Sequence, residues 1–353
     1  MLYHLALHLK QTFSWLNVIH YVSFRAMAAL LTSLLTSFLF GNYFIEKSKL
    51  FFRSGVREYT PDSHKIKNNM PTMGGVFILA TVLINSLMWC NLWRGEVFVL
   101  LLCLIGFGAI GFFDDLYKIY YKKGLSASRK FILQLSVSFV VGLLLVLNGI
   151  DLSVSFPFFK NIHPNIGLFF IPWVMLILVG CSNAVNLTDG LDGLALSSLI
   201  PNFALYSLIA YIAGHYTLAT YLQIPFAGSS EITVIGTTLV GACLGFLWYN
   251  TYPAQIFMGD VGSLALGSGL ALMAIIAKQE LLLIVSGGLF VVEALSVILQ
   301  VLSFKLLGKR IFKMAPIHHH FELLGWQESK ITVRFAIISL ILCLLALMTL
   351  KMR

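Results

Sequence analysis

Residues 100–118 read LLLCLIGFGAIGFFDDLYK, an apolar run that ends in the adjacent pair Asp114 and Asp115. A run of about 20 mostly apolar residues is long enough to cross a bilayer. Two neighbouring carboxylates at the end of such a run are costly to hold, so their presence needs a chemical reason. Lys118 follows Asp114 by four residues, one helical turn, and is therefore within reach of an ion pair. The stretch predicts a membrane helix that brings acidic groups to one membrane surface.

The rest of the chain also has the composition of a membrane protein. Of its 353 residues, 58% are hydrophobic and only 11% are charged, whereas soluble domains carry about 25% charged residues. We expect an all-α polytopic membrane protein in which residues 1–353 form a single integral-membrane domain. Residues 1–20 show no cleavable signal and are expected to form a surface helix rather than a flexible tail. The five cysteines have no paired spacing, which indicates neither a disulfide framework nor a zinc site.

Hydropathy predicts about ten transmembrane helices, each a run of about 20 apolar residues. Residues 195–221 fit either one span or a broken one. The candidate spans are 22–43, 74–93, 97–116, 131–150, 166–185, 194–213, 233–251, 261–279, 281–304 and 332–350.

Basic residues predict the orientation of these spans. The segments 44–72, 117–130 and 305–334 hold 17 of the 24 lysines and arginines, and such residues concentrate in cytoplasmic loops. With ten spans, these segments fall on the same side as the short connections 186–193 and 252–260. We therefore expect both termini to be periplasmic. The polar clusters then gather on the cytoplasmic face, where we expect the active site.

Two polar clusters follow the acidic pair along the chain. Asn186, Asp189 and Asp192 are spaced three residues apart, so a helix would place them on one face, whereas neighbouring glycines equally allow a tight turn. Asp260 precedes a helix predicted to start near Val261. It is expected either to cap that helix or to hold a metal ion that bridges to phosphate.

The connection before that helix contains Asn250 and Phe257. The Phe257 ring is a surface for base stacking or an ordinary packing group. Further along, His318, His319 and His320 form a triplet. Adjacent imidazoles cannot easily bind one ion, so contacts with phosphate are the favoured interpretation.

Basic and intramembrane polar residues complete the candidate set. Lys67 and Lys130 each precede a predicted span, either as part of a positive-inside collar or as ligands of substrate phosphate. Glu293 and Gln300 lie seven residues apart in one apolar span and so share a face. They either form an interhelical hydrogen bond or bind substrate.

Four segments together resemble the polyprenyl-phosphate N-acetylhexosamine-1-phosphate transferase family. The acidic segments resemble the whole superfamily, whereas residues 71–75 and 316–326 resemble its muramoyl-pentapeptide branch. The four segments are 114–118, 186–193, 257–260 and 314–322.

The resemblance implies an enzyme that transfers phospho-N-acetylmuramoyl-pentapeptide from its UDP donor to undecaprenyl phosphate, releases UMP and forms lipid I. It also implies a Mg²⁺ requirement, a multi-pass position in the bacterial inner membrane, and a role in peptidoglycan synthesis and hence in cell shape and division. The lipid acceptor would explain the membrane bundle, and the water-soluble donor would explain the cytoplasmic gathering of polar groups.

Roles for the candidate residues follow from this reaction. We expect Asp260 to bind Mg²⁺, Asp114 to orient or deprotonate the acceptor phosphate, and Asp115 to support it. The residues expected to hold metal or uridine are Asn186, Asp189, Asp192, Asn250 and Phe257. Those expected to contact donor phosphates or other parts of the substrates are Lys67, Lys130, Gln300, His318, His319 and His320.

Several alternatives stay open. One aspartate of the 114–115 pair could act as a covalent nucleophile. A sister transferase would use UDP-N-acetylglucosamine instead. An ion-coupled transporter is disfavoured, because transport places polar groups at mid-membrane in several spans. The net charge of +9 is explained by topology and contact with membrane lipids, and no basic-aromatic module indicates a nucleic-acid partner. The sequence does not fix the oligomeric state, and a homodimer is left open.

Overall fold

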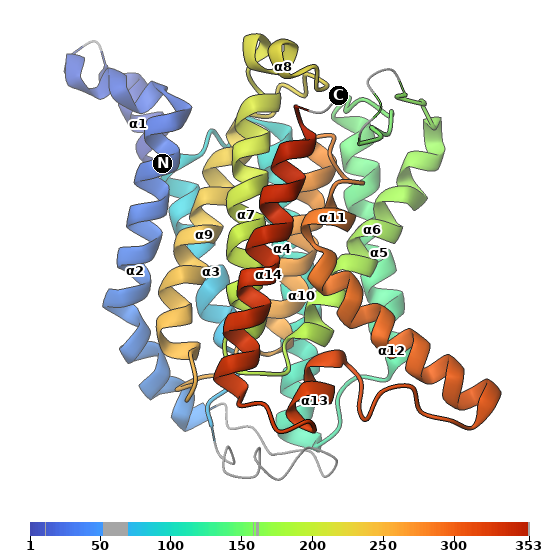
Figure 1. The fold of residues 1–353 in the computed structure, drawn as a ribbon. Coiled ribbons are helices and arrows are strands. Elements are labelled where there is room, and N and C mark those ends of the chain that lie inside the picture. The colour runs from blue at the N-terminus through green and yellow to red at the C-terminus, as the bar shows by residue number, and fades with distance from the viewer. Residues whose placement is uncertain (11, 52–69, 158, 160–161, 352–353) are drawn as a thin grey trace.

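The computed structural model describes residues 1–10, 12–51, 70–157, 159 and 162–351, and these residues are helical apart from their connections (Figure 1). An isolated antiparallel bridge pairs Ser153 with Asn165. The helices are α1 (Leu2–Leu9), η1 (Ser14–His20), α2 (Val22–Phe51), α3 (Gly74–Trp89), α4 (Gly95–Tyr121), α5 (Ala127–Leu147), η3 (Gly167–Phe169), α6 (Phe170–Thr188), α7 (Leu194–Ala213), α8 (Tyr216–Leu222), α9 (Glu231–Asn250), α10 (Gly259–Ile276), α11 (Leu283–Ser286), α12 (Gly288–Leu307), α13 (Ile317–Glu322) and α14 (Glu328–Thr349).

The described helices make this a polytopic membrane protein. Nine of them are long and apolar enough to cross a membrane, and α3 is a shorter apolar helix of 16 residues. Each of the predicted spans overlaps one of these helices. The region left open at residues 195–221 forms one helix, α7, which continues through Pro201 and is followed by the separate α8. The span predicted at 281–304 begins instead with the short α11 and continues as α12.

Helix α10 forms the centre of the bundle. Of its membrane-spanning window, 89% is buried inside the protein, compared with 28% for α5 and 22% for α12. It packs against α4, α6, α3 and α7. Its sequence is rich in glycine, alanine and serine, and in a bilayer such small residues let helices approach closely where no hydrophobic effect drives them together.

Different short helices lie at the two ends of the bundle. Helix α13 lies at one end, whereas α1, α8 and the C-terminal end of α14 lie at the other (Figure 1). The turn after α6 belongs to the α13 end, because the Asp192 N–H donates to Glu328 at the start of α14 (2.8 Å). The polar clusters gather at this end.

A buried ion pair fastens α2 to α9 at the opposite end. The two terminal nitrogens of Arg25 lie 2.7 and 2.6 Å from the carboxylate oxygens of Glu231. Arg25 also donates to the Trp89 carbonyl at 3.1 Å, and the Tyr3 ring covers its guanidinium group. The Asn91 N–H donates to the same carboxylate at 3.1 Å. One charge pair therefore joins α1, α2, α9 and the end of α3.

Replacing Arg25 with Met is expected to destabilise the fold by about 3 kcal/mol, because it leaves a buried carboxylate without its counter-ion. The double replacement Arg25→Met/Glu231→Gln removes both charges and is expected to recover most of that loss. Thermal unfolding in detergent measures both effects. A single variant as stable as the wild type would contradict the role given to this pair.

Glu280, a second buried ionisable residue, lies in the connection between α10 and α11. Burial raises the pKa of Glu280 to about 7, and the nearby Lys278 ammonium offsets this only in part. Lys278 donates to the carbonyls of Asp151 and Ser153 and lies over the Phe170 ring. The fold therefore favours the protonated form of the Glu280 carboxyl group.

This raised pKa makes the free energy of unfolding depend on pH. Between about pH 4.5, the ordinary value, and pH 7 the folded state binds more protons than the unfolded chain. The contribution is present in full below pH 4.5 and is lost as pH rises through 7, a change of up to about 3 kcal/mol. Glu280→Gln is expected to flatten this decline in Tm measured from pH 5 to 8. Parallel pH profiles for the variant and the wild type would refute it.

Candidate active site

Three carboxylates from two helices converge at the α13 end of the bundle. Asp114 and Asp115 lie near the C-terminal end of α4, and Asp260 lies in the first turn of α10. One oxygen from each lies within 4.8 Å of the others. Within the described ranges, no other group of three His, Cys, Asp or Glu side chains converges in this way. Asp114 and Asp115 are buried, so their negative charges must be offset by protein groups or by a cation.

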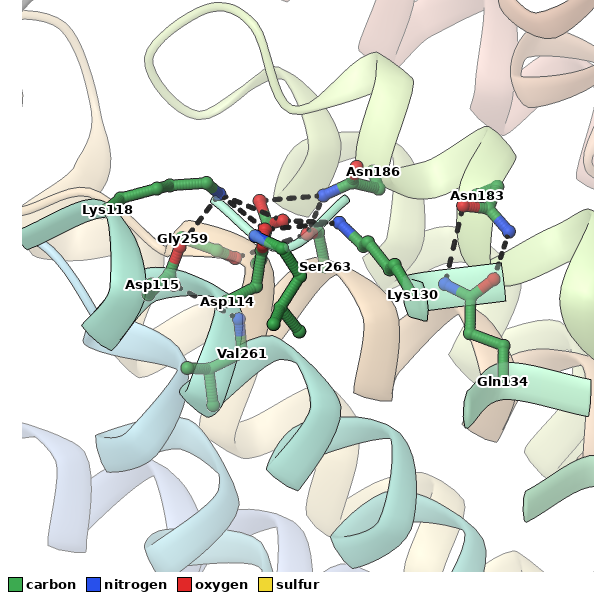
Figure 2. A network of polar contacts seen from close by, with 12 residues as sticks. Asp114, Asp115, Lys118, Lys130, Gln134, Asn183, Asn186, Gly259, Val261 and Ser263 are labelled. Atoms are coloured by element: carbon green, nitrogen blue, oxygen red, sulfur yellow. Dashed lines mark hydrogen bonds and ion pairs between the residues drawn. The ribbon is translucent and has the colours of Figure 1, made fainter. Parts of the chain in front are cut away.

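Two lysines supply the nearest positive charges. The Lys118 ammonium lies 2.8 Å from Asp114, 3.1 Å from Asp115 and 3.0 Å from Asp260. Lys130, in the first turn of α5, lies 2.5 Å from Asp260 and 3.5 Å from Asp114 (Figure 2). The predicted pairing of Asp114 with Lys118 is confirmed. Lys118 is in addition the partner of all three carboxylates.

Two glycines allow the helices to approach closely enough for this cluster. A Cβ atom on Gly111 of α4 would overlap the backbone of Asp260. Gly259 has φ +75°, a left-handed conformation that glycine adopts without steric cost, and a Cβ there would collide with the Asp115 carboxylate. The Val261 N–H points at the same carboxylate, 3.4 Å away. The start of α10 can therefore lie directly against the acidic pair.

Neutral donors complete the shell around the carboxylates. The Asn186 amide donates to Asp260 at 3.0 Å and to the Ser263 hydroxyl at 2.8 Å. The Leu125 N–H donates to Asp114 at 2.6 Å. Asp260 lies inside the first turn of α10, after the N-cap residue, so it is not the cap of that helix. Its oxygens face the two lysines and Asn186.

The turn after α6 brings a further carboxyl group to the site. Helix α6 ends at Thr188, so Asp189 and Asp192 lie in a turn rather than along one helix face. Although Asp189 keeps some accessible surface, burial of its carboxyl group, reinforced by the charges of Asp260 and Asp115, raises its pKa to about 8. The site therefore favours the protonated form of this carboxyl group more than water does.

Asp192 and Asn250 hold the loops that surround the cluster. The Asp192 carboxylate accepts from the Ala254 N–H at 3.0 Å. The Asn250 amide accepts from the Gly193 N–H at 3.1 Å and donates to the Ile256 carbonyl at 2.8 Å. Both side chains are buried. In this structure they join the turn after α6 to the connection that precedes α10.

That connection is also paired with the residues before α3. The Phe257 N–H donates to the Pro71 carbonyl and the Phe257 carbonyl accepts from the Gly74 N–H, both at 2.9 Å, and the Gly75 N–H donates to Met258 at 2.8 Å. Phe257 itself remains partly exposed. The motif at residues 71–75 thus supports the backbone that carries Phe257 and leads into α10.

The histidine triplet is divided among three environments. His318 is fully buried, with Nδ1 3.1 Å from Glu293. His319 lies 2.6 Å from Glu322, and His320 accepts from a backbone N–H at 3.1 Å. Each imidazole therefore has a different polar partner, although the ring centroids of His318 and His319 lie only 4.2 Å apart.

His318 and Gln300 each contact another part of the chain. The ring of His318 contacts the turn after α6, since a Cβ on Gly190 would overlap its Nε2 atom. The Gln300 amide accepts from two N–H groups and donates to one carbonyl of residues 311–312. Glu293 and Gln300 therefore share a face of α12, as predicted, and both bind the segment that follows that helix.

One candidate residue cannot be placed in the structure, and some contacts at the site were not predicted from the sequence. Lys67 lies outside the described residues, so its role stays a prediction. The contacts of Lys118 with Asp115 and Asp260 were not predicted, although its spacing from Asp115 could have indicated the first. Nothing in the sequence pointed to Ser263.

The donor set fits a hard divalent cation. All three converging groups are carboxylates, and carboxylate oxygens are the protein ligands preferred by Mg²⁺ and Ca²⁺. A cavity of about 300 Å³ between α1 and η1 lies at the opposite end of the molecule (Figure 1), and no acidic side chain lines it. The charged cluster, rather than that cavity, is the candidate active site.

Comparison with known proteins agrees with this site. Residues 97–278, which include all three carboxylates and both lysines, match the model for glycosyl transferase family 4. The chain is 51% identical to a phospho-N-acetylmuramoyl-pentapeptide-transferase of Citrifermentans bemidjiense, with all of both chains covered. Transferases of the same name from Pelobacter propionicus (51%) and Geobacter sp. strain M21 (50%) also match over all of both chains. The chain belongs to the phospho-N-acetylmuramoyl-pentapeptide-transferases, within glycosyl transferase family 4.

Proposed function

We propose that this protein transfers phospho-N-acetylmuramoyl-pentapeptide from UDP-N-acetylmuramoyl-pentapeptide to undecaprenyl phosphate and so forms lipid I and UMP. The observation that carries the proposal is the cluster of three carboxylates held by Lys118 and Lys130 within the family-matched segment. Joining two phosphate groups requires positive charge at the reacting phosphorus and fixed groups that hold both anions. The membrane bundle suits a lipid acceptor.

We place this site on the cytoplasmic face of the bacterial inner membrane. Lys118 and Lys130 belong to the basic segment 117–130, and the three most basic segments fall on one side when α3 is counted as a span. An even number of spans then puts both termini in the periplasm. The described membrane helices pack around α10, which supports a single integral-membrane domain.

For the cation we propose Mg²⁺, held by Asp114, Asp115 and Asp260. Mg²⁺ is commonly bound by one or two carboxylates together with substrate phosphates. When bound, it would neutralise the charge that develops on the transferred phosphate. Asn186, which donates to Asp260, would keep that carboxylate oriented.

The transfer makes one bond and breaks one. An oxygen of undecaprenyl phosphate bonds to the phosphorus that carries the sugar, and the bond from that phosphorus to the bridging oxygen breaks, so that this oxygen leaves with UMP. Asp114 would orient the acceptor phosphate, and Lys118 and Lys130 would hold the two phosphates of the donor. Asp189 would contact the metal or the uridine, and the Phe257 ring would stack on uracil.

The other candidate residues fall into two groups. We propose that Lys67, His319 and His320 contact the donor directly. Four further side chains contact protein groups in this structure, and for these we propose that they position the loops that line the site: Asp192, Asn250, Gln300 and His318.

Direct transfer is favoured over a covalent enzyme intermediate. Both oxygens of Asp114 are engaged, one by the Leu125 N–H and the other by the two lysines. Asp115 is likewise divided between Lys118 and the Val261 N–H. A nucleophilic carboxylate would have to give up one of these partners before it could attack.

The proposed function is tested by UMP release from the muramoyl-pentapeptide donor. Release is expected only when both Mg²⁺ and undecaprenyl phosphate are present. Asp260→Asn and Asp114→Asn are each expected to lower kcat/KM at least about 100-fold, because each removes a group that stabilises charge in the transition state. Asp151→Asn, an aspartate near Lys278 between α5 and α6, is the matched control and should retain full activity.

Other outcomes would redirect the assignment. Transfer from UDP-N-acetylglucosamine but not from the muramoyl-pentapeptide donor would identify the sister activity. Solute uptake by reconstituted protein that makes no lipid-linked sugar would support a transporter. A phosphorylated enzyme trapped without the lipid acceptor would replace direct transfer with the covalent route.

A further inference from the structure

A reciprocal pair of amide side chains joins α5 to α6 beside the acidic cluster (Figure 2). The Asn183 amide nitrogen donates to the Gln134 oxygen at 2.8 Å, and the Gln134 nitrogen donates back to the Asn183 oxygen at 3.4 Å. Gln134 is only 1% exposed. An amide in such a place is costly when it lacks a partner, and here each amide satisfies the other.

On α5, the pair belongs to a row of residues that leads to the cluster. Lys130, Gln134, Ser138 and Gly142 recur every four residues and so lie along one face of the helix. The last three of these are buried, and Gly142 packs against Ile171 of α6. Lys130 continues the row by one turn beyond Gln134. The packing of α5 against α6 therefore sets the position of the Lys130 backbone, and with it the reach of the Lys130 side chain.

On α6, Asn186 occupies the position that corresponds to Lys130 on α5. Asn186 lies three residues after Asn183, about one helical turn further toward the cluster. Asn186 donates to one oxygen of Asp260 at 3.0 Å, and Lys130 contacts the other oxygen at 2.5 Å. The residues one turn beyond Gln134 and Asn183 thus hold the same carboxylate from two sides.

Helix α5 lies at the edge of the bundle and is less buried than α10. Only 28% of its membrane-spanning window is buried, and its main packing partners are α4 and α6. In lipid, apolar side chains do not drive helices together, so close packing of small residues and interhelical hydrogen bonds set their relative position. Because hydrogen bonds are directional, two reciprocal amides fix both the rotation and the depth of α5 against α6.

We propose that Gln134 and Asn183 are positioning residues for phosphate transfer. They act through Lys130 and Asn186, whose hold on Asp260 depends on the spacing that the amide pair sets. The inference rests on the proposed function, because the step that it serves is the proposed transfer reaction.

The test separates position from stability with two double variants. Gln134→Met/Asn183→Leu removes both amides at similar volume and leaves neither unpaired, so we expect a Tm close to that of the wild type. We expect kcat/KM for the UDP donor to fall about tenfold or more, because small displacements of positioned groups cost up to about 100-fold. Gln134→Asn/Asn183→Gln restores an amide at each position and is expected to recover most of the rate.

A matched control comes from a buried amide on another pair of helices. Asn202 of α7 donates to Ser339 of α14 at 3.3 Å, and Asn202→Leu should change the rate only as far as it changes Tm. Wild-type rates in Gln134→Met/Asn183→Leu at an unchanged Tm would overturn the proposal. A loss of rate that follows the loss of Tm, or that the exchanged pair does not recover, would also overturn it.

A second readout does not depend on transfer. Lys130 competes with a cation for Asp260 and Asn186 orients that carboxylate, so displacing both is expected to change Mn²⁺ affinity several-fold, as measured by electron paramagnetic resonance. The exchanged pair should return the affinity to the wild-type value. Wild-type protein that binds Mn²⁺ but transfers nothing would sink the proposed function alone. Equal Mn²⁺ affinity in all variants would sink the positioning role.

Discussion

Two ammonium groups hold three carboxylates together at one end of this helical bundle. Unit charges 4 Å apart interact by about 4 kcal/mol at the effective dielectric of a protein surface, so Asp114, Asp115 and Asp260 would repel one another strongly if left alone. Lys118 contacts all three and Lys130 contacts two. The cluster still carries one net negative charge. If the two ammonium groups moved to the substrate phosphates, a divalent cation would take their place and neutralise the carboxylates.

The remainder of the fold serves to bring these charges together from separate helices. The central α10 delivers Asp260, α4 delivers the acidic pair and Lys118, and the peripheral α5 delivers Lys130. Close helix approach at Gly111 places Asp260 against α4, while buried amides and backbone pairs fix the loops. Asp192 and Asn250 are examples of buried side chains near the site that bond to backbone groups of neighbouring loops.

Much of the fold could be predicted from the sequence, because a membrane helix is encoded by a continuous apolar run. The i to i+4 pairing of Asp114 with Lys118 is similarly local. By contrast, the contact of Lys118 with Asp260 and the pairing of Gln134 with Asn183 join residues that are far apart in the chain. Such contacts depend on how helices pack, which hydropathy does not specify. The break between α11 and α12 was missed for a related reason, since residues 281–304 are apolar enough on average to be predicted as one span.

We propose above that Asp114, Asp115 and Asp260 together hold one divalent cation. Anomalous diffraction from crystals grown with Mn²⁺ tests it most directly. We expect one strong peak among these three carboxylates, and its loss in Asp260→Asn. A peak at residues 318–320 instead, or none at a Mn²⁺ concentration that supports transfer, would contradict it.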